Sequence, residues 1–361
     1  MTRKHGLEEH RASRPALSTR NRTDALVALE GVPSKVLVVV AGTGSMGARH
    51  LQVLENQIDA VAIAFPAREE RRSELLRVGT RVCENWEQAY EQGARFGVIA
   101  TDTGRHVSDA ESAIRAGFDL LIEKPLAPSA ENLSELKRLA DQFGRSIFIA
   151  CNLRFDEGLL TFRKHLASIG DVHSVRIECQ SYLPDWRPHR DYRGSYSADA
   201  KQGGVLRDLI HEIDYAVWLF GKPQRVLGLL ANSGTLGIAA EDAADLLWET
   251  PSGTSVSIRL DYVSRISRRR MTAFGTLGEI RLDFLNKSVC LRIAGADPVV
   301  FQHNQERDEM IARQLTAFLN DSRPSDLTTF DEAAFALALC DAARQSSTSA
   351  RWETIKDWRT A

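Results

Sequence analysis

The chain has 361 residues, of which 43% are hydrophobic and 26% are charged, and its formal net charge is -2 at pH 7. This length exceeds what one hydrophobic core usually serves, so we expect two globular domains. The near-neutral charge and the lack of a long Lys/Arg block argue against nucleic-acid binding, and no apolar run approaches the ~20 residues that span a membrane.

The cysteines are odd in number and widely spaced, without a C-x-x-C pair: Cys83, Cys151, Cys179, Cys290 and Cys340. This pattern argues against a structural metal and for reduced thiols in the cytoplasm. Residues 1–34 are polar and Arg-rich, and they lack the apolar segment of a signal peptide. We interpret them as a polar N-terminal extension, disordered or loosely docked; a start codon placed too far upstream would give the same composition.

From Lys35 the pattern changes to short apolar runs separated by stretches with helical periodicity. Near-continuous apolar strands that alternate with helices are typical of a parallel sheet covered on both faces. The predicted strands are 36–40, 60–65, 97–100, 119–122 and 146–150. We therefore predict a doubly wound α/β domain over residues 35–154.

A second domain is predicted over residues 155–361, where several strands follow one another through turns. We expect helices at 155–168, 204–220, 307–320 and 330–346, and strands at 172–179, 225–231, 244–248, 255–262, 270–274 and 279–284. Within 255–262 apolar and polar residues alternate, which is the period of a half-buried antiparallel strand. The second domain is thus predicted to be α/β with a mostly antiparallel sheet.

A G-x-G-x-x-G motif stands between the first predicted strand and the helix after it, with residues Gly42, Thr43, Gly44, Ser45, Met46 and Gly47. In a dinucleotide-binding turn the first glycine allows the tight bend, the second lets the backbone approach the pyrophosphate, and the third permits close strand–helix packing. The helix N-terminus then faces an anion. A structural turn without a ligand is the alternative, but the strand–turn–helix context favours NAD(P) binding.

The end of the second strand bears on the choice between NAD and NADP. An acid that holds the ribose hydroxyls of NAD is expected there, about 20 residues after the motif. The strand ends instead with Phe65 and Pro66, and three arginines follow, Arg68, Arg71 and Arg72. Guanidinium groups could bind a 2'-phosphate, so we favour NADP slightly over NAD, with Arg68 as the contact. The alternative is a solvated helix start, since two glutamates dilute the charge.

Polar side chains follow two of the other predicted strands, at the sheet edge where ligands of open α/β sheets bind. The predicted cofactor contacts there are Thr101, Thr103, His106, Glu123 and Lys124. Asp102, between the threonines, either shapes the nicotinamide pocket or caps the following helix. Further on, Asp208 and His211 are three residues apart on the predicted helix 204–220, so they should share one face of it.

Together these residues resemble the Gfo/Idh/MocA oxidoreductase family, from Lys35 to about Thr354. The resemblance rests on the glycine motif, Thr101 with His106, Glu123-Lys124-Pro125, Asn152 with Arg154, the segment from Gly203 to His211 with Asp214, Trp218 and Gly221, and the turn Gly275 to Gly278. It implies a Rossmann domain followed by an α/β domain with an open sheet, whose face commonly builds homodimers or homotetramers. It also assigns the catalytic lysine, aspartate and histidine to Lys124, Asp208 and His211.

These residue types suit hydride transfer at an alcohol carbon. His211 would take the hydroxyl proton, Asp208 could orient the imidazole, and Lys124 would stabilise negative charge on the oxygen and touch the nicotinamide ribose. Many family members have four positions between the aspartate and the histidine, whereas Asp208 and His211 are only three residues apart in this chain. The alternatives are a solvated Lys124 and a satisfied core histidine at His211, and Asp214 fits a structural role better than a catalytic one.

A loop rich in Trp, Arg and Tyr leads into the catalytic helix and is predicted to form a substrate wall. Its candidate substrate-binding residues, with one from the preceding segment, are Arg154, Trp186, Arg187, Tyr192 and Arg193. Aromatic faces suit sugar C–H surfaces, and arginines could pair with a carboxylate or phosphate. The loop resembles that of family members from bacterial surface-glycan and nonulosonic-acid pathways, which implies an acidic or nucleotide-linked sugar. Alternatively, the aromatic residues fill the domain junction.

The function predicted from these residues is an oxidoreductase that transfers a hydride between a nicotinamide cofactor and a hydroxyl or keto carbon of a sugar-like substrate. One alternative is a glycosidase on the same fold that oxidises the sugar transiently and returns the hydride. Another is a non-catalytic ligand sensor, although a sensor has no need of the base His211. No metal is expected in the site.

Overall fold

The computed structural model describes residues 35–320 and 326–360, and the predicted N-terminal extension lies outside them. Its first sheet has six strands in the order β14-β5-β4-β3-β1-β2. The five strands that run parallel are β1 (Val36–Ala41), β2 (Ala60–Phe65), β3 (Phe96–Ile99), β4 (Asp119–Ile122) and β5 (Ile147–Ile149). Each predicted strand of this region is confirmed to within one residue at either end, because both faces are buried and the apolar runs are continuous.

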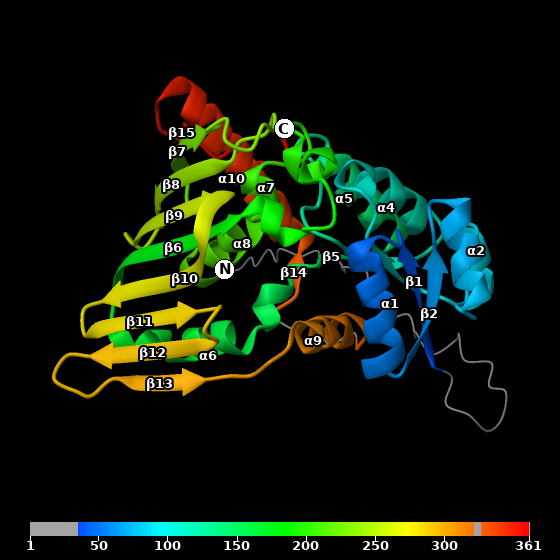
Figure 1. Ribbon diagram of the computed structural model, residues 1–361, viewed down its shortest axis with the longest axis horizontal. Coiled ribbons are helices and arrows are strands. Elements are labelled where there is room, and N and C mark those ends of the chain that lie inside the picture. Colours follow the sequence, from blue (N-terminus) through cyan, green and yellow to red (C-terminus); the bar gives the residue numbers. More distant parts are fainter. Residues whose placement is uncertain (1–34, 321–325, 361) are drawn as a thin grey trace, which may run out of the picture. The chain divides into compact units, whose positions relative to one another are not determined.

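Helices flank this sheet, and their apolar stripes explain where they lie. They are α1 (Ser45–Gln57), α2 (Glu69–Arg77), α3 (Trp86–Glu91), α4 (His106–Arg115) and α5 (Leu133–Phe143). In α5 the buried residues Leu133, Leu136, Leu139 and Ala140 recur at helical spacing. The helix stops at Gly144, whose φ of 62° is left-handed and therefore suits glycine. This half of the molecule is a Rossmann fold (Figure 1).

The second sheet has nine strands in the order β13-β12-β11-β10-β6-β9-β8-β7-β15. Their bounds are β6 (Val172–Tyr182), β7 (Arg225–Ala231), β8 (Ala243–Glu249), β9 (Ser255–Asp261), β10 (Val263–Gly275), β11 (Gly278–Asp283), β12 (Ser288–Ile293), β13 (Val299–Gln302) and β15 (Glu353–Thr354). Only β6 and β9 pair in parallel among these described strands. The predicted α/β fold with a mostly antiparallel second sheet is confirmed. Strand β10 begins at Val263 rather than at the predicted residue 270, because its first residues are mostly polar and show no strand pattern in the sequence.

Helices cover one face of the second sheet, and no described helix covers the other face (Figure 1). The covering helices include α6 (Glu157–His165), α8 (Ile210–Phe220) and α10 (Phe330–Ser349). On β6 the residues Val175 and Ile177 are buried beneath them, whereas Arg176 is exposed on the opposite face. This alternation is what a sheet with one covered face requires.

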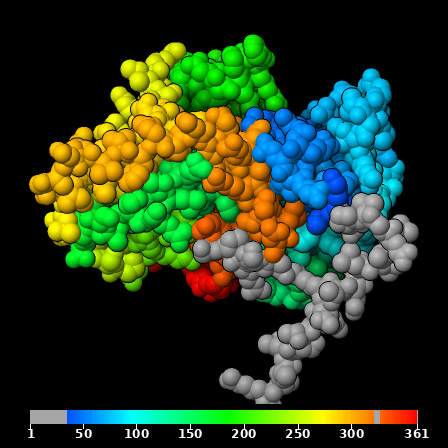
Figure 2. Space-filling model, turned by 90° about the horizontal axis from the view of Figure 1, so that it is seen from below, coloured from blue at the N-terminus to red at the C-terminus, as the bar shows by residue number. Residues whose placement is uncertain are grey.

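The chain returns from the second sheet to the first near its C-terminal end. Helix α9 (Arg307–Leu319) packs against α1, and β14 (Thr328–Thr329) pairs antiparallel with β5. In Figure 2 the orange segment that contains α9 lies directly against the blue segment that contains α1. A domain boundary between residues 154 and 155 therefore excludes β14, which belongs to the first sheet. The sequence could not predict this strand, because two residues show no periodicity.

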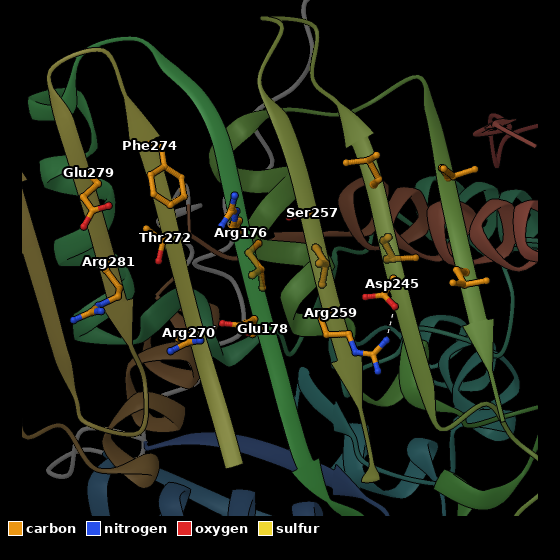
Figure 3. Close-up of a pocket in the computed structure, with 16 residues that line it drawn as sticks. Arg176, Glu178, Asp245, Ser257, Arg259, Arg270, Thr272, Phe274, Glu279 and Arg281 are labelled. Carbon is orange, nitrogen blue, oxygen red and sulfur yellow. Dashed lines mark hydrogen bonds and ion pairs between the residues drawn. The ribbon is translucent and has the colours of Figure 1, made fainter. Parts of the chain in front are cut away.

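The open face of the second sheet carries pairs of opposite charge together with apolar side chains. Figure 3 shows Arg259 beside Asp245 and Arg270 beside Glu178 on neighbouring strands. Leu229 and Leu247, on β7 and β8, line the same hollow of about 720 Å³ and stay exposed. None of the predicted catalytic residues lies there. Within the described part of the chain, no helix is long and apolar enough to cross a membrane.

Candidate active site

The glycine loop between β1 and α1 has the geometry that each glycine of the motif implies. Gly42 has a φ of +84°, and a Cβ there would lie 2.5 Å from the carbonyl oxygen of Ala100. A Cβ at Gly47 would lie 1.8 Å from the carbonyl oxygen of Gly42, so helix and turn are in direct contact. At Gly44 a Cβ would meet no atom within 4 Å. Protein packing explains the first and third glycines, and an approaching ligand best explains the second.

The N-terminus of α1 is suited to an anion. Gly44 is its N-cap residue and supplies no side-chain hydrogen bond, and the first turn contains no acidic residue. The first amide N–H groups of a helix have no intrahelical partner, and the helix dipole favours negative charge there. These observations fit the pyrophosphate of a dinucleotide, held by the backbone from Gly42 to Gly47.

The predicted 2'-phosphate contact, Arg68, stands at the N-cap of α2, directly after β2. The amide of Gly42 donates to the carbonyl oxygen of Phe65 at 3.0 Å, so the end of β2 and the glycine loop are joined. Arg71 pairs with Glu74 and Arg72 pairs with Glu84, whereas no ion pair involves Arg68 among the described residues. Of the three arginines, Arg68 is thus the one whose charge is available.

The side chains after β3 are used within the protein. Thr101 donates to Asp109 at 2.7 Å, and Thr103 is buried. Asp102 is the N-cap residue of the short turn Thr103–Arg105, but its side chain makes no capping hydrogen bond, so the predicted cap is wrong. Because the side chains of Thr101 and Thr103 are engaged or buried, mainly backbone groups at the end of β3 are left to contact a cofactor.

His106 requires a correction. Its ring is 1% exposed, with Nδ1 2.9 Å from the carbonyl oxygen of Pro125 and Nε2 3.1 Å from that of Thr101. Burial lowers the pKa of His106, and the two carbonyl contacts oppose that shift. The ring has a carbonyl oxygen close to each nitrogen and donates to one of them in its neutral form, so His106 links the ends of β3 and β4. The sequence had suggested a contact with the cofactor instead.

Glu123 is also an internal residue, since its carboxylate lies 2.7 Å from Nε2 of the buried His50 on α1. Burial by itself would raise the pKa of Glu123, but the hydrogen bond and charge of His50, together with Lys124 and His106, lower it. The predicted cofactor contact of its side chain is therefore replaced by a link between α1 and the loop that carries Lys124.

Lys124 and Asp208 are brought together from segments 84 positions apart. The ammonium Nζ of Lys124 donates to the main-chain oxygen of Asp208 at 2.7 Å and lies 3.6 Å from its carboxylate. Ser197 and Tyr262 donate to the same carboxylate at 2.6 and 2.9 Å, and Tyr196 donates to its other oxygen. Asp208 is 3% exposed, so a buried carboxylate with three hydroxyl donors anchors the lysine.

The predicted helix 204–220 is broken at Leu209, into α7 (Val205–Asp208) and α8. Leu209 has φ -98° and ψ 31°, outside the helical region, and it separates Asp208 from His211. No hydrogen bond joins the two side chains, and Nδ1 of His211 is buried without a partner among the described residues. The expectation that Asp208 orients the imidazole is wrong, because the break turns the carboxylate toward Lys124.

The environment of His211 is cationic. Burial lowers its pKa well below the ordinary value, and the charges of Lys124, Arg269 and Arg307 lower it further. A lowered pKa favours the neutral imidazole, which is the form that a proton acceptor needs. Lys124, Asp208 and His211 thus lie close together, but Asp208 interacts with Lys124 and makes no hydrogen bond to His211 among the described residues.

Arg154 is the second correction. Its side chain is 1% exposed and donates through Nε and Nη2 to Asp214 at 2.9 and 2.7 Å, and through Nη1 to Glu332 at 3.1 Å. Three of the five N–H groups of this guanidinium donate to these carboxylates, and because the side chain is buried, a substrate anion cannot reach the other two. Arg154 joins η3 (Asn152–Phe155) to α8 and α10, and Asp214 has the structural role that the sequence favoured.

The substrate loop is divided between two environments. Trp186 donates to Ser181 at 2.9 Å, and its ring meets Tyr262 edge-on at 5.4 Å. Arg187 is near enough for its positive charge to act on the pKa of Tyr196, which donates a hydrogen bond to Asp208. Tyr192 instead donates to the carbonyl oxygen of Leu236 at 3.0 Å, and Arg193 stacks over Tyr192.

Three residues near the site were missed in the sequence: Tyr262, Arg269 and Arg307. Arg269 belongs to a run of three arginines that reads as the exposed side of a strand, and Arg307 opens an ordinary amphipathic helix. No local signal distinguishes them, because their position depends on β10 and α9 returning to the same place.

Comparison with known proteins agrees with this geometry. Residues 36–150 match a model of the oxidoreductase family with an NAD-binding Rossmann fold, and residues 161–281 match the GFO/IDH/MocA C-terminal domain. The chain is 28% identical over 228 residues to inositol 2-dehydrogenase of Rhizobium meliloti, covering 60% of this chain and 66% of that protein. It is 31% identical over 133 residues to the scyllo-inositol 2-dehydrogenase (NADP(+)) IolW of Bacillus subtilis, covering 36% of each.

Two further similarities are informative. The 2,7-anhydro-N-acetylneuraminate hydratase of Escherichia coli is 26% identical over 222 residues, covering 59% of this chain and 58% of the hydratase. A levoglucosan dehydrogenase solved with NADH and levoglucosan superimposes with a TM-score of 0.78 over 89% of this chain and all of its own, at 17% identity. The matches to these curated relatives cover between about a third and two thirds of their length. From the two family matches, the chain belongs to the Gfo/Idh/MocA family of NAD(P)-binding oxidoreductases.

Proposed function

We propose that this protein is an NAD(P)-dependent dehydrogenase or reductase that acts on a hydroxyl or keto carbon of a sugar-like substrate. The observation that carries the proposal is the meeting of Lys124, Asp208 and a neutral His211 from two distant segments. A dinucleotide-type glycine loop belongs to the same Rossmann sheet edge. The named relatives act on inositols and anhydrosugars, which are compounds rich in CH–OH groups.

Each polar residue has a defined part in the proposed chemistry. A bound nicotinamide ring supplies or accepts the hydride. His211 accepts the hydroxyl proton in oxidation and returns it in reduction. The ammonium of Lys124 stabilises negative charge on the reacting oxygen, and Asp208 holds that ammonium in position. The phenol of Tyr196 extends the Asp208 network toward the substrate loop.

For the cofactor we propose a slight preference for NADP over NAD. Arg68 stands at the end of β2 without an ion-pair partner among the described residues, and no acid occupies the ribose-binding position. One relative is named for NADP(+), whereas the levoglucosan dehydrogenase was solved with NADH. Both cofactors therefore occur among similar proteins, and Arg68 is the feature that favours NADP.

For the substrate we propose an acidic or nucleotide-linked sugar, such as those of nonulosonic-acid pathways. Trp186 offers an aromatic face next to Tyr262, and Arg187 carries positive charge to the same side of the loop. The similarity to a protein that acts on 2,7-anhydro-N-acetylneuraminate, a carboxylated sugar, supports this choice. Tyr192 and Arg193 remain predicted loop contacts.

The direct test combines cofactor binding with a substrate panel. Purified protein would be titrated with NADPH and NADH, and then assayed under multiple turnovers with neutral, carboxylated and nucleotide-linked sugars, following the absorbance of the reduced nicotinamide. We expect tight cofactor binding and net turnover of at least one acidic sugar. Failure to bind either cofactor would remove the oxidoreductase proposal, and turnover of neutral polyols alone would remove only the acidic substrate.

A second candidate is transient oxidation with return of the hydride, in which the sugar is cleaved or hydrated without net redox change. The similarity to a hydratase favours keeping it, since addition of water requires no oxidant. Product release without a change in nicotinamide absorbance over many turnovers would identify this reaction. Net reduction of the cofactor by the same substrate would identify the dehydrogenase.

We also propose that the open face of the second sheet mediates homodimer or homotetramer formation. Leu229 is 67% exposed and Leu247 38% exposed on this face, amid charged pairs that a second copy could complement (Figure 3). Light scattering on the eluted protein should give the mass of two or four chains, and Leu229→Asp with Leu247→Asp should give one. A monomeric native protein would contradict this assignment.

A further inference from the structure

The loop that carries Lys124 is held on both sides by a buried histidine. Before the lysine, the carboxylate of Glu123 lies 2.7 Å from Nε2 of His50. After it, the carbonyl oxygen of Pro125 lies 2.9 Å from Nδ1 of His106. Both imidazole rings are 1% exposed. The main chain around the lysine is therefore fixed from two directions.

The two histidines connect this loop to different parts of the first domain. His106 reaches only main-chain oxygens at the ends of β3 and β4. His50 belongs instead to α1, the helix that starts directly after its N-cap residue Gly44 in the glycine loop. Among the described residues, no other side-chain hydrogen bond joins α1 to the loop of Lys124. His50 is thus the polar link between the proposed pyrophosphate site and the lysine.

The hydrogen bond between His50 and Glu123 has a charged acceptor. A carboxylate only accepts hydrogen bonds, so Nε2 of His50 carries the proton of this contact. The other carboxylate oxygen accepts from the main-chain amide of Lys124 at 3.3 Å. Burial by itself raises the pKa of Glu123, and the hydrogen bond from His50 is the largest effect that lowers it. The buried carboxylate therefore depends on His50 for its charge and its position.

Lys124 is attached at its other end to the second domain. Its ammonium donates to the main-chain oxygen of Asp208 at 2.7 Å, and its side chain is 18% exposed. The main chain beside the lysine is tied to α1 through Glu123, whereas the ammonium is tied to α7. A displacement of about 1 Å between reacting groups can lower a rate strongly. The contact at Glu123 therefore affects where the ammonium lies relative to the glycine loop.

We propose that His50 is a positioning residue, which holds the Lys124 loop in place relative to the glycine loop through the carboxylate of Glu123. This inference rests on the proposed function, because it gives α1 a part in aligning the lysine with a bound nicotinamide ring. The competing explanation is a buried pair that only stabilises the fold. Removal of such a pair would lower the melting temperature and leave the ammonium of the folded protein where it is.

The test uses substitutions that differ in reach but not in chemistry. In His50→Gln the amide N–H extends about as far as Nε2, whereas in His50→Asn it stops one methylene short. Glu123→Asp shortens the acceptor instead and should repeat the effect of His50→Asn. Val53→Ala is the matched control, because Val53 is buried on the same helix and loses only apolar packing. It should lower the melting temperature without any effect on Lys124.

Activity would be measured on the full chain saturated with whichever of NADPH and NADH binds more tightly, using the sugar that the native protein turns over fastest. We expect His50→Asn and Glu123→Asp to lower kcat about tenfold or more. His50→Gln should retain kcat to within about threefold, because the hydrogen bond is preserved. The cofactor Kd should change less than about threefold in every variant, since the glycine loop is intact.

Chemical labelling gives a second measurement that needs no substrate. The cofactor-saturated proteins would be treated with a limiting amount of acetic anhydride, and the acetylation of Lys124 would be followed by mass spectrometry. A lysine released from Asp208 is more accessible, so His50→Asn should acetylate Lys124 about threefold or more faster than the native protein. His50→Gln and Val53→Ala should give the native rate.

Two results would overturn the inference. One is native kcat together with a native labelling rate of Lys124 in His50→Asn and Glu123→Asp, with only the melting temperature lowered. The other is a loss in His50→Gln as large as in His50→Asn, which would assign the effect to packing of the imidazole ring. If the native protein turns over no sugar, the proposed function fails, whereas the labelling rates still decide whether His50 positions Lys124. The two failures are therefore distinguishable.

Discussion

The ammonium of Lys124 donates to the main-chain oxygen of Asp208 at 2.7 Å, and the carboxylate of Asp208 faces the lysine rather than His211. The lysine, which follows a strand of the Rossmann sheet, is thereby held by a residue of the second domain. Any shift of α7 relative to β4 would move the ammonium. In the proposed reaction Asp208 is consequently a positioning residue for Lys124, and no hydrogen bond joins its carboxylate to His211 among the described residues.

Asp208→Asn should lower kcat on the order of 10- to 100-fold, because a misplaced ammonium loses its alignment with the reacting oxygen. KM for the cofactor should change little. Tyr262→Phe removes one of three hydroxyl donors to the same carboxylate and should have a smaller effect. Steady-state kinetics of both variants would check this. A normal kcat in Asp208→Asn would show that Lys124 needs no such anchor.

His211→Asn should leave the cofactor affinity unchanged and reduce turnover about 10²- to 10⁴-fold, the usual contribution of a general base. Fluorescence titration with the cofactor and steady-state assays would measure the two effects separately. Turnover close to that of the native protein would remove His211 from the proton-transfer role.

The pH profile should report the lowered pKa of His211. A base works in its neutral form, so kcat/KM for oxidation falls as pH drops through its pKa. Burial and three neighbouring cations place that pKa well below about 6.5, so activity should persist to lower pH than for an ordinary histidine. Arg307→Gln removes one cation and should move the acid limb to higher pH. An acid limb at or above about 6.5 in the native protein would contradict this.

Arg154→Met should lower the free energy of unfolding by about 3–5 kcal/mol, because it leaves Asp214 buried without its partner. Arg163→Met is the control, since Arg163 lies over the same Trp218 ring but is 42% exposed in its pair with Asp326. It should cost less than about 1 kcal/mol. Urea denaturation would measure both. Equal effects of the two substitutions would show that the buried Arg154–Asp214 pair contributes no more to stability than the exposed Arg163–Asp326 pair.

Gly44→Ala and Gly47→Ala should separate ligand space from protein packing. Gly44 has an extended backbone (φ -71°, ψ -161°) and open space around a Cβ, so alanine should leave the melting temperature unchanged. It should weaken cofactor binding about tenfold or more, because the Cβ would enter the space proposed for the pyrophosphate. Gly47→Ala should instead destabilise the protein by about 1–3 kcal/mol. Unchanged cofactor affinity in Gly44→Ala would argue against a dinucleotide at this loop.

Arg68→Gln should lower the ratio of NADPH to NADH affinity about tenfold, as expected for loss of a charged hydrogen bond to a phosphate. Arg71→Gln is the control, because Arg71 is already paired with Glu74. Titrating each variant with both cofactors would give the two ratios. An unchanged ratio for Arg68→Gln would assign the arginine to the solvated surface.

Much of the fold could be predicted because its signals are local. The buried strands of the first sheet are continuous apolar runs, and β2 and β4 have the predicted ends. The glycine motif was readable because its spacing lies within one short turn between a strand and a helix, although packing within the protein constrains only Gly42 and Gly47. By contrast, β14 was missed, since two residues carry no periodicity and its pairing with β5 depends on a segment 179 positions away, as for Thr328 and Ile149.

The candidate site divides in the same way. Residue type and spacing in the sequence identified Lys124, Asp208 and His211 together with the glycine loop, because these features depend on neighbours in the chain. Only the tertiary structure turned Asp208 toward Lys124, enclosed Arg154 with Asp214, and brought Arg269 and Arg307 near enough for their charges to lower the pKa of His211. Side-chain partners and net local charge are sums over residues distant in sequence, so they arise only when the folded backbone brings those residues together.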